Sequence, residues 1–205
     1  MKNEITPQKF IRSYWNYFID LEEQLISTKR YVDFDKTNDN TFSIEYLKLL
    51  QATCSEIDVV AKIIAEYYDS SFAVAENKSI QKWGFVLQNT FKDLNNLSVQ
   101  FNNDYDIVPW NNWQYEKYID KKQKTRYKLK GDCKTPYWWI AYNKVKHERT
   151  SNYGSGQTNY MRANLHNLVS AMAALFLLET MFLSKLKLDN GYFEYQKSKL
   201  FIVND

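Results

Sequence analysis

Apolar residues recur every three or four positions over several long segments of this chain, which is the spacing of one face of an α-helix. The first segment follows Thr6, whose hydroxyl can cap a helix that begins with Pro7. Apolar residues then continue at helical spacing to about Arg30. The pattern predicts one long helix there, and the polar run from Asp33 to Thr41 predicts a loop after it.

Two further helices are expected before residue 95. Ser43 can cap a helix that runs to about Tyr68, in a register that suits antiparallel packing on the first helix. A third helix is expected to begin near Ser79. Gly84 lies inside it, and glycine lowers the stability of a helix interior.

Helical spacing disappears between residues 95 and 135. The short runs LSVQF, YDIVPW and RYKLK are rich in strand-forming residues and are separated by Asn, Asp and Pro. We therefore expect an insertion that is irregular or contains short strands. A segment of this length without regular structure is uncommon in a compact domain, so we expect it to be functional or partly mobile.

Thr135 and Pro136 repeat the pattern of a capping residue followed by proline, which predicts a helix that ends near Thr150. The turn SNYGSGQTN comes next. A last helix of about 28 residues is expected to begin at Thr158 or Asn159 and to end near Gly191. The tail, residues 191–205, is expected to be extended, with a strand-like end that can join a small sheet or a partner.

These elements predict an all-α fold, a helical bundle of about five long helices with an irregular or small β insertion around residues 95–135. The composition agrees, because 5 glycines and 3 prolines are too few for a turn-rich β sandwich and a 17% aromatic content argues against disorder. The length fits a single domain over residues 1–205 that includes the insertion and the tail.

The net charge of +3 is too small to indicate nucleic-acid binding, but the charge is unevenly distributed. Seven Lys or Arg residues lie between Lys117 and Lys130, with Asp120 as the one acidic residue among them. This stretch is either a solvated ribbon or a surface for an anionic ligand.

The cysteine spacing, the N-terminus and the longest apolar run all favour a cytoplasmic protein. Cys54 and Cys133 are too far apart in sequence to suggest a zinc cluster or a disulfide framework. The segment MKNEITPQKF has no apolar stretch of signal-peptide length. The run from Leu168 to Leu183 is shorter than the ~20 residues that span a bilayer, so we expect a core helix and no membrane association.

The helix predicted after Pro136 carries the most concentrated set of polar side chains. Lys146 and His147 follow Asn143 by three and four residues and therefore share one face with it, with Arg149 at the helix end. Trp139 and Tyr142 form an overlapping aromatic stripe with Lys146. Because an imidazole can act as acid or base near neutral pH, His147 is the candidate catalytic group, with Asn143 and Lys146 beside it. The alternative is that the face is solvated or forms structural hydrogen bonds.

Other helices can add ligand-binding groups to this face. Asn164 and Asn167 open the last helix, and antiparallel packing would bring their amides near Lys146 and His147. These amides can instead cap or bridge helices. Glu56, in the segment SEIDVVAK, is a candidate carboxylate partner of the same cluster.

Other chemistries have no motif in this sequence. G-x-x-x-x-G-K-[ST], G-x-G-x-x-G, H-E-x-x-H and G-x-S-x-G do not occur, which gives no support to a nucleotide triphosphatase, a dinucleotide-binding enzyme, a zinc protease or an α/β-hydrolase. With 2 histidines in the chain, we expect no metal site and no cofactor.

The segments WWIAYNKVKHER and RANLHNLVSAMAALFLLE resemble bacterial all-helical proteins related to the HEPN superfamily. The resemblance covers mainly residues 136–183. Active HEPN ribonucleases carry Arg, a polar residue, three variable positions and His on a core helix, and they commonly act as dimers. The aligned segment here runs from Tyr142 to His147. Asn143 and His147 match, whereas Tyr142 stands at the arginine position and cannot supply its charge.

Two hypotheses follow from the resemblance. In the first, Lys146 or Arg149 replaces the missing arginine, and the protein is a homodimer that binds RNA or another phosphate-bearing ligand and cleaves RNA without a metal through His147. Its context would be phage defence or a toxin–antitoxin pair, with a protein partner in that system. In the second, the protein is a catalytically inactive interaction or scaffold protein, and its Asn/Lys/His cluster is structural.

Overall fold

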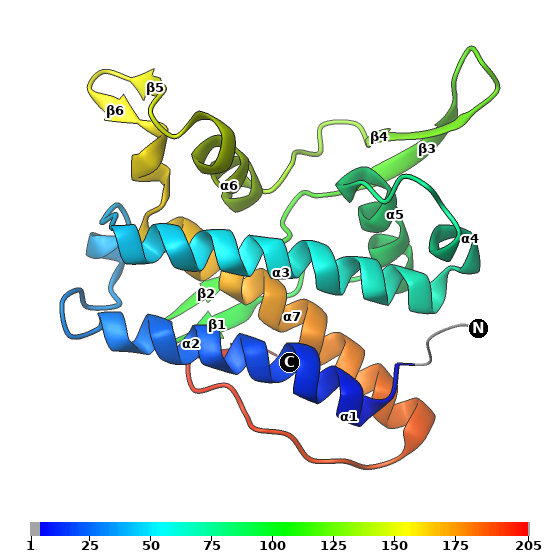
Figure 1. Ribbon diagram of the computed structural model, residues 1–205, viewed down its shortest axis with the longest axis horizontal. Coiled ribbons are helices and arrows are strands. Elements are labelled where there is room, and N and C mark those ends of the chain that lie inside the picture. The colour runs from blue at the N-terminus through cyan, green and yellow to red at the C-terminus, as the bar shows by residue number, and fades with distance from the viewer. Residues whose placement is uncertain (1–4, 205) are drawn as a thin grey trace.

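The computed structural model describes residues 5–204 and contains both helices and strands (Figure 1). About 54% of the chain is helical and 13% forms strands in three small sheets, so the fold is mixed. The prediction of an all-α bundle of about five long helices is therefore wrong. The strands are two to five residues long, and segments this short show too little alternation in the sequence to be separated from loops.

The first predicted helix is present but is built from three consecutive pieces. These are α1 (Pro7–Phe10), a π-helical segment (Ile11–Trp15) and α2 (Asn16–Thr28). The Thr6 side chain accepts a hydrogen bond from the Lys9 amide, as the capping pattern predicted. Trp15 is fully buried, and its indole N–H donates to the Gln196 carbonyl at 2.8 Å. This bond ties the first helix to the C-terminal tail.

Two long helices, α3 (Ile44–Tyr68) and α7 (Leu165–Asn190), form the centre of the molecule (Figure 1). The first residue of α7 is joined to the segment just before α3, because the Leu165 amide donates to the Thr41 carbonyl at 2.9 Å. Their last turns are also joined, because the Tyr67 hydroxyl donates to Asp189. The two helices therefore run parallel. By length and composition α7 could cross a membrane, but 83% of its most apolar stretch is buried inside this fold.

A three-stranded antiparallel sheet covers one side of the helices, with β1 (Val99–Phe101) between β2 (Tyr105–Ile107) and β7 (Phe201–Val203). Phe101 and Phe201 face each other across the sheet and belong to the core. The carboxylate of Glu22, which is fully buried on α2, accepts hydrogen bonds from the Lys199 and Leu200 amides at 3.0 and 3.1 Å and from the Ser198 hydroxyl. The end of the tail is thus fixed to the body.

The second sheet is a two-stranded hairpin of β3 (Tyr115–Ile119) and β4 (Thr125–Leu129), which packs against α5 (Ile80–Thr90). A short helix, α4 (Ser70–Ala73), leads from α3 toward α5. Gly84 allows this contact, because a Cβ atom there would lie 2.6 Å from the buried indole of Trp113. Gly84, which was expected to lower the stability of the helix, therefore leaves the space in which Trp113 and the hairpin pack.

The helix with the polar cluster is α6 (Tyr137–Glu148), whose N-cap is Pro136 and not Thr135. After it come a small hairpin, β5 (Asn152–Gly154) and β6 (Gln157–Thr158), and a 3-10 turn (Asn159–Arg162). The last helix therefore begins at Leu165, later than predicted, with Asn164 as its cap. A second 3-10 turn (Lys36–Asn38) lies between α2 and α3.

Candidate functional site

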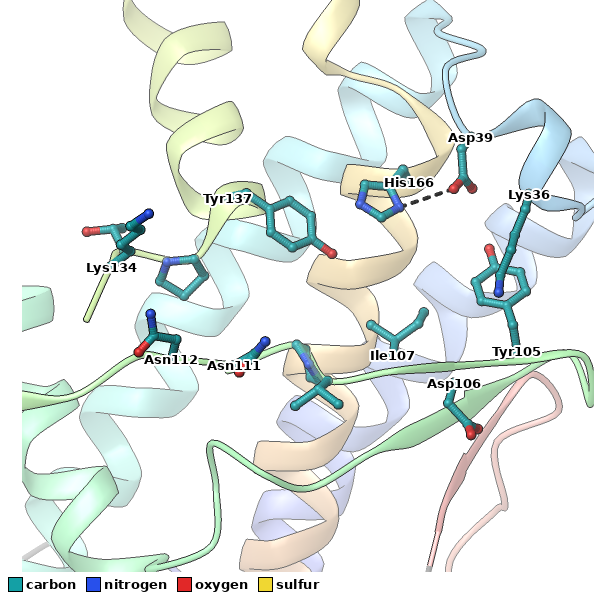
Figure 2. A pocket seen from close by; sticks show the side chains of 14 residues that line it. Lys36, Asp39, Tyr105, Asp106, Ile107, Asn111, Asn112, Lys134, Tyr137 and His166 are labelled. Carbon is teal, nitrogen blue, oxygen red and sulfur yellow. Dashed lines mark ion pairs between the residues drawn. The ribbon is translucent and has the colours of Figure 1, made fainter. Parts of the chain in front are cut away.

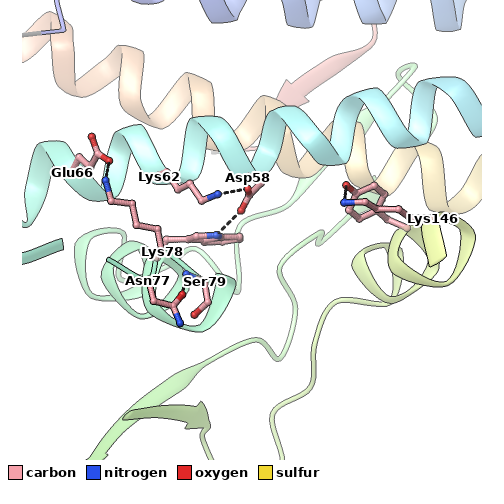
Figure 3. A network of polar contacts seen from close by, with 9 residues as sticks. Asp58, Lys62, Glu66, Asn77, Lys78, Ser79 and Lys146 are labelled. Atoms are coloured by element: carbon pink, nitrogen blue, oxygen red, sulfur yellow. Dashed lines mark hydrogen bonds and ion pairs between the residues drawn. The ribbon is translucent and has the colours of Figure 1, made fainter. Parts of the chain in front are cut away.

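The predicted cluster on α6 lies on its C-terminal half, where His147, Lys146 and Arg149 are exposed. Lys146 reaches back along the helix, and its ammonium group donates to the Tyr142 hydroxyl at 3.3 Å (Figure 3). The Asn143 amide donates to the Trp139 carbonyl of the preceding turn at 2.9 Å. Two of the three predicted catalytic side chains are thus bonded within their own helix.

The aromatic residues of the cluster pack inward. Tyr142 is buried, and the Trp139 ring lies 5.4 Å from it and 6.0 Å from the ring of Trp83 on α5. The Trp83 indole N–H in turn donates to Asp58 on α3 at 3.0 Å, and Asp58 also pairs with Lys62 (Figure 3). Trp139 and Tyr142 therefore help to join α6 to α5 and α3.

The other predicted ligand-binding residues lie elsewhere. The Asn164 side chain accepts from the Asn167 amide N–H, and the Asn167 side chain donates to the Arg162 carbonyl, so both form the start of α7. Glu56 is on the face of α3 opposite to Asp58, because two residues turn a helix by about 200°. Its charge contributes to the raised pKa of Glu179 on α7, after the larger effect of burial. The sequence grouped these residues, but the structure separates them.

The N-terminal ends of α6 and α7 meet, at the opposite end of α6 from His147. The Tyr137 ring stacks on the His166 ring with centroids 4.9 Å apart and planes 11° from parallel. The hydroxyls of Tyr137 and Ser170 form a hydrogen bond of 2.6 Å. His147 is ten residues beyond Tyr137, about 15 Å further along the helix.

A pocket of about 500 Å³ opens beside these two helix ends, which is a volume suited to a small organic ligand (Figure 2). Its walls come from the loop before α3, from β2 and the segment after it, from the segment before α6, and from the first turns of α6 and α7. The lining residues are Lys36, Asp39, Tyr105, Asp106, Ile107, Val108, Pro109, Asn111, Asn112, Lys134, Thr135, Pro136, Tyr137 and His166.

His166 is held in this pocket from two sides. Its Nδ1 atom faces the Asp39 carboxylate at 3.4 Å, and its backbone N–H donates to the Asp39 carbonyl at 3.1 Å. Tyr137 stacks on the flat side of the ring. The side chain remains 46% exposed, and the Nε2 atom lies on the side of the ring away from Nδ1. An imidazole with one nitrogen oriented by a carboxylate and the other accessible is an arrangement suited to proton transfer.

The Asp39 side of the pocket also contains two buried polar atoms without a hydrogen-bond partner among the described residues. They are the Oδ1 atom of Asp39, an acceptor, and the hydroxyl of Tyr105, a donor. Burial, followed by the charge of Asp39, raises the pKa of Tyr105, so its hydroxyl keeps its proton. A buried polar group without a partner costs free energy, so both atoms would be stabilised by a ligand that supplies an acceptor and a donor. Because both atoms are buried, their side chains must first turn toward the pocket to reach such a ligand.

The mouth of the pocket carries opposite charges. The Lys36 ammonium lies 4.9 Å from the centre of the Tyr105 ring, and Lys134 lines the wall on the α6 side. Asp39 and Asp106 balance them. The Tyr137 hydroxyl remains neutral, because its own burial raises its pKa and outweighs the opposite effect of the hydrogen bond with Ser170. The pocket thus offers separate positive and hydrogen-bonding positions instead of one uniform charge.

The chain matches no protein-family model, no curated protein and no solved structure. The resemblance to the HEPN superfamily therefore stays a prediction, and the site has to be interpreted from its own geometry. Among residues 5–204 there is no group of three or more His, Cys, Asp or Glu side chains arranged to hold a metal ion.

Sequence reasoning missed most of this pocket. Asp39 stood in a segment identified only as a polar loop, and Tyr137 and Tyr105 stood among many aromatic residues. One signal was present, because His166 is one of 2 histidines in the chain. Its partners are far away in sequence, so no spacing could connect them.

Proposed function

We propose that the protein binds a nucleotide unit of RNA in the His166 pocket and that His166 transfers a proton in a metal-independent cleavage of the strand. The observation that carries the proposal is the Asp39–His166 pair, which leaves one ring nitrogen accessible beside buried hydrogen-bonding atoms that have no partner. The proposal keeps the predicted ligand class and moves the reacting group from His147 to His166.

The polar groups of the pocket are arranged as a nucleotide requires. The edge of a nucleobase presents donors and acceptors together, which can pair with the Asp39 Oδ1 acceptor and the Tyr105 hydroxyl donor once these buried side chains turn toward the pocket. The amides of Asn111 and Asn112 line the same space. Lys36 and Lys134 at the mouth can pair with phosphate oxygens.

The chemistry needs one base and no metal. Nε2 of His166 removes the proton from a ribose 2′-hydroxyl, and the 2′-oxygen then forms a bond to the adjacent phosphorus. The bond from phosphorus to the 5′-oxygen breaks, and that oxygen takes a proton from water. The products are a 2′,3′-cyclic phosphate and a 5′-hydroxyl end. A lysine ammonium at the mouth stabilises the charge that develops on the phosphate.

The 2 histidines make the test direct, because each variant leaves one imidazole. We expect His166→Gln to abolish cleavage of single-stranded RNA in the presence of EDTA, while the matched variant His147→Gln keeps it. In proton NMR spectra, added uridine monophosphate should shift the ring signal of His166 and leave that of His147 unchanged. Loss of cleavage in His147→Gln alone would return the reaction to α6. Absence of both cleavage and nucleotide binding in the wild type would refute the proposal.

The second candidate function is a non-enzymatic interaction protein. It is favoured by the α6 cluster itself, where Asn143 and Lys146 are bonded to Trp139 and Tyr142 of the same helix. In that case Asn143→Ala and His147→Ala would change the melting temperature or partner binding, and the wild type would neither bind nor cleave RNA. A homodimer, a partner in a defence system and a cytoplasmic location remain predictions, of which sedimentation of the purified protein tests the first.

A further inference from the structure

Positive charge is concentrated on the hairpin of β3 and β4. Residues 115–130 contain seven Lys or Arg residues and two acidic residues, Glu116 and Asp120, a formal charge of +5 in a chain whose total is +3. The remainder of the chain is therefore negative. The hairpin strands pair only with each other, and Figure 1 shows them extending away from the helices beyond α5. We call this basic, extended hairpin, residues 115–130, the arm.

The base of the arm is fixed to the body. Tyr115 is buried, and its amide N–H donates at 2.7 Å to the Gln88 side chain, which also donates to the Tyr115 carbonyl. Further out, the Tyr127 ring lies 5.3 Å from Phe85 of α5, and the Lys117 ammonium lies 4.6 Å from the same Phe85 ring. One face of the ribbon is thus occupied by α5.

The tip is a built turn that presents lysines. The Asp120 carboxylate accepts hydrogen bonds from the Lys122 and Lys124 amides at 2.8 and 2.9 Å and from the Arg126 side chain at 2.9 Å. These hydrogen bonds fix the backbone of the turn, and the lysine side chains of the tip are exposed to solvent. Among the described residues, the ammonium groups of Lys121, Lys122 and Lys124 form no ion pair, whereas Arg126 does.

The ribbon connects the tip to the His166 pocket. The Lys130 amide donates to the Gln114 carbonyl, and the Lys134 amide donates to the Asn112 carbonyl, both at 2.9 Å. Asn112 and Lys134 line the pocket. The two segments that form the arm therefore stay paired by backbone hydrogen bonds as far as the pocket, with lysines at the tip, at Lys130 and at Lys134.

We infer that this arm, residues 115–130, binds the phosphate backbone of a single-stranded RNA whose next nucleotide enters the pocket. The inference rests on the proposed function for the position of that nucleotide. A row of lysines with exposed aromatic groups is a sequence-independent surface for a single strand, and Tyr118 is 41% exposed on the outer face. A membrane surface fits less well, because Ile119 is a single exposed aliphatic side chain beside a tip that is otherwise polar, and one such residue buries little area in a bilayer.

The test compares a triple variant of the tip, Lys121→Gln, Lys122→Gln and Lys124→Gln, with a control of equal charge, Lys9→Gln, Lys185→Gln and Lys197→Gln. The control residues lie on α1, on the last turns of α7 and on the tail. The ligands are uridine monophosphate and a 2′-O-methyl RNA dodecamer, which cannot be cleaved, with duplex DNA and phosphatidylserine vesicles as competing partners. The His166 ring signal is followed in parallel by proton NMR. Binding is measured by fluorescence anisotropy or calorimetry over a series of salt concentrations.

We expect the tip variant to bind the dodecamer at least about tenfold more weakly than the control and to lower the salt slope by about 2, because each phosphate contact on a single strand contributes about 0.7. Binding of the monophosphate should not change. Equal dodecamer binding by the two variants would overturn the inference but leave the pocket proposal intact. Tip-dependent binding without any shift of the His166 signal would instead refute the pocket. Preference for duplex DNA or for phosphatidylserine vesicles would refute the assignment to a single strand.

Discussion

Two fully buried glutamates provide a sharp test of this structure, because they have opposite surroundings. Glu22 accepts three hydrogen bonds from the C-terminal tail. Glu179, in the middle of α7, has no partner for either carboxyl oxygen among the described residues. Burial, with a further contribution from the charge of Glu56, raises the pKa of Glu179 well above its ordinary value. The side chain is therefore protonated and unsatisfied in the folded protein.

We expect Glu179→Met to stabilise the protein at pH 7. A buried polar group without a partner costs about 1–3 kcal/mol, and methionine has a similar length and no polar hydrogen to satisfy. In a domain of this size each kcal/mol raises the melting temperature by roughly 2–4 °C. The variant should therefore melt about 2–12 °C above the wild type, as measured by circular dichroism.

The effect should also depend on pH, with a fixed sign. Below the ordinary pKa of a glutamate, both the folded and the unfolded chain hold the proton, and Glu179 adds no pH dependence. Above it the unfolded chain releases the proton while the folded chain keeps it, so the wild type loses stability as the pH rises toward the raised pKa. The stabilisation by Glu179→Met should thus be larger at pH 7 than at pH 4.5 in urea titrations.

Glu22→Met is the matched control. It leaves the Lys199 and Leu200 amides and the Ser198 hydroxyl without their acceptor, and we expect a loss of at least about 3 kcal/mol because hydrogen bonds to a charged group are strong. A destabilised Glu179→Met with no dependence on pH would refute the reasoning. It would mean that the Glu179 carboxyl has a polar environment that these contacts do not reveal.

Three further substitutions test particular contacts. Gly84→Ala should lower the free energy of unfolding in urea by about 1–3 kcal/mol, because its Cβ would meet Trp113, whereas a glycine in an open helix would be improved by alanine. Tyr105→Phe should leave the melting temperature of the free protein unchanged or slightly higher, yet weaken binding of uridine monophosphate in calorimetry, because it removes a hydroxyl that has no partner in the protein. Asn164→Ala should cost about 1 kcal/mol in thermal unfolding by removing the acceptor for the Asn167 amide N–H, and a larger loss would indicate an additional role.

The helices were predictable where a capping side chain and a regular apolar stripe coincide. Ser43 caps α3 through the Tyr46 amide N–H, and α3 ends at Tyr68 as expected. Thr6 and Pro7 begin the first helix in the same way. The start of α7 was placed too early, because the 3-10 turn before it shares the helical spacing of apolar residues while Asn164 is the actual cap.

The strands could not be predicted as a sheet, because their pairing depends on contacts over long distances in the sequence. β1 pairs with β7 through Phe101 and Phe201, and the tail is held at this position by distant residues such as Glu22 and Trp15. The prediction of strand-like segments in residues 95–135 and near the C-terminus was local, and it gave no way to join them. Because the sequence did not reveal how the strands pair, the fold was predicted to be all-helical.

The polar cluster on α6 could be predicted from the sequence, whereas the pocket could not. Neighbouring residues on one helix can be grouped from spacing alone, so Asn143, Lys146 and His147 formed a visible cluster. His166 and Asp39 are brought together by the fold, because the loop before α3 is hydrogen-bonded to the start of α7 through Thr41 and Leu165. These ties are backbone hydrogen bonds, so they place positions 39 and 166 side by side whatever side chains stand there. The choice of an acid and a histidine at these two positions is therefore separate from the fold, and no spacing in the sequence could indicate the pair.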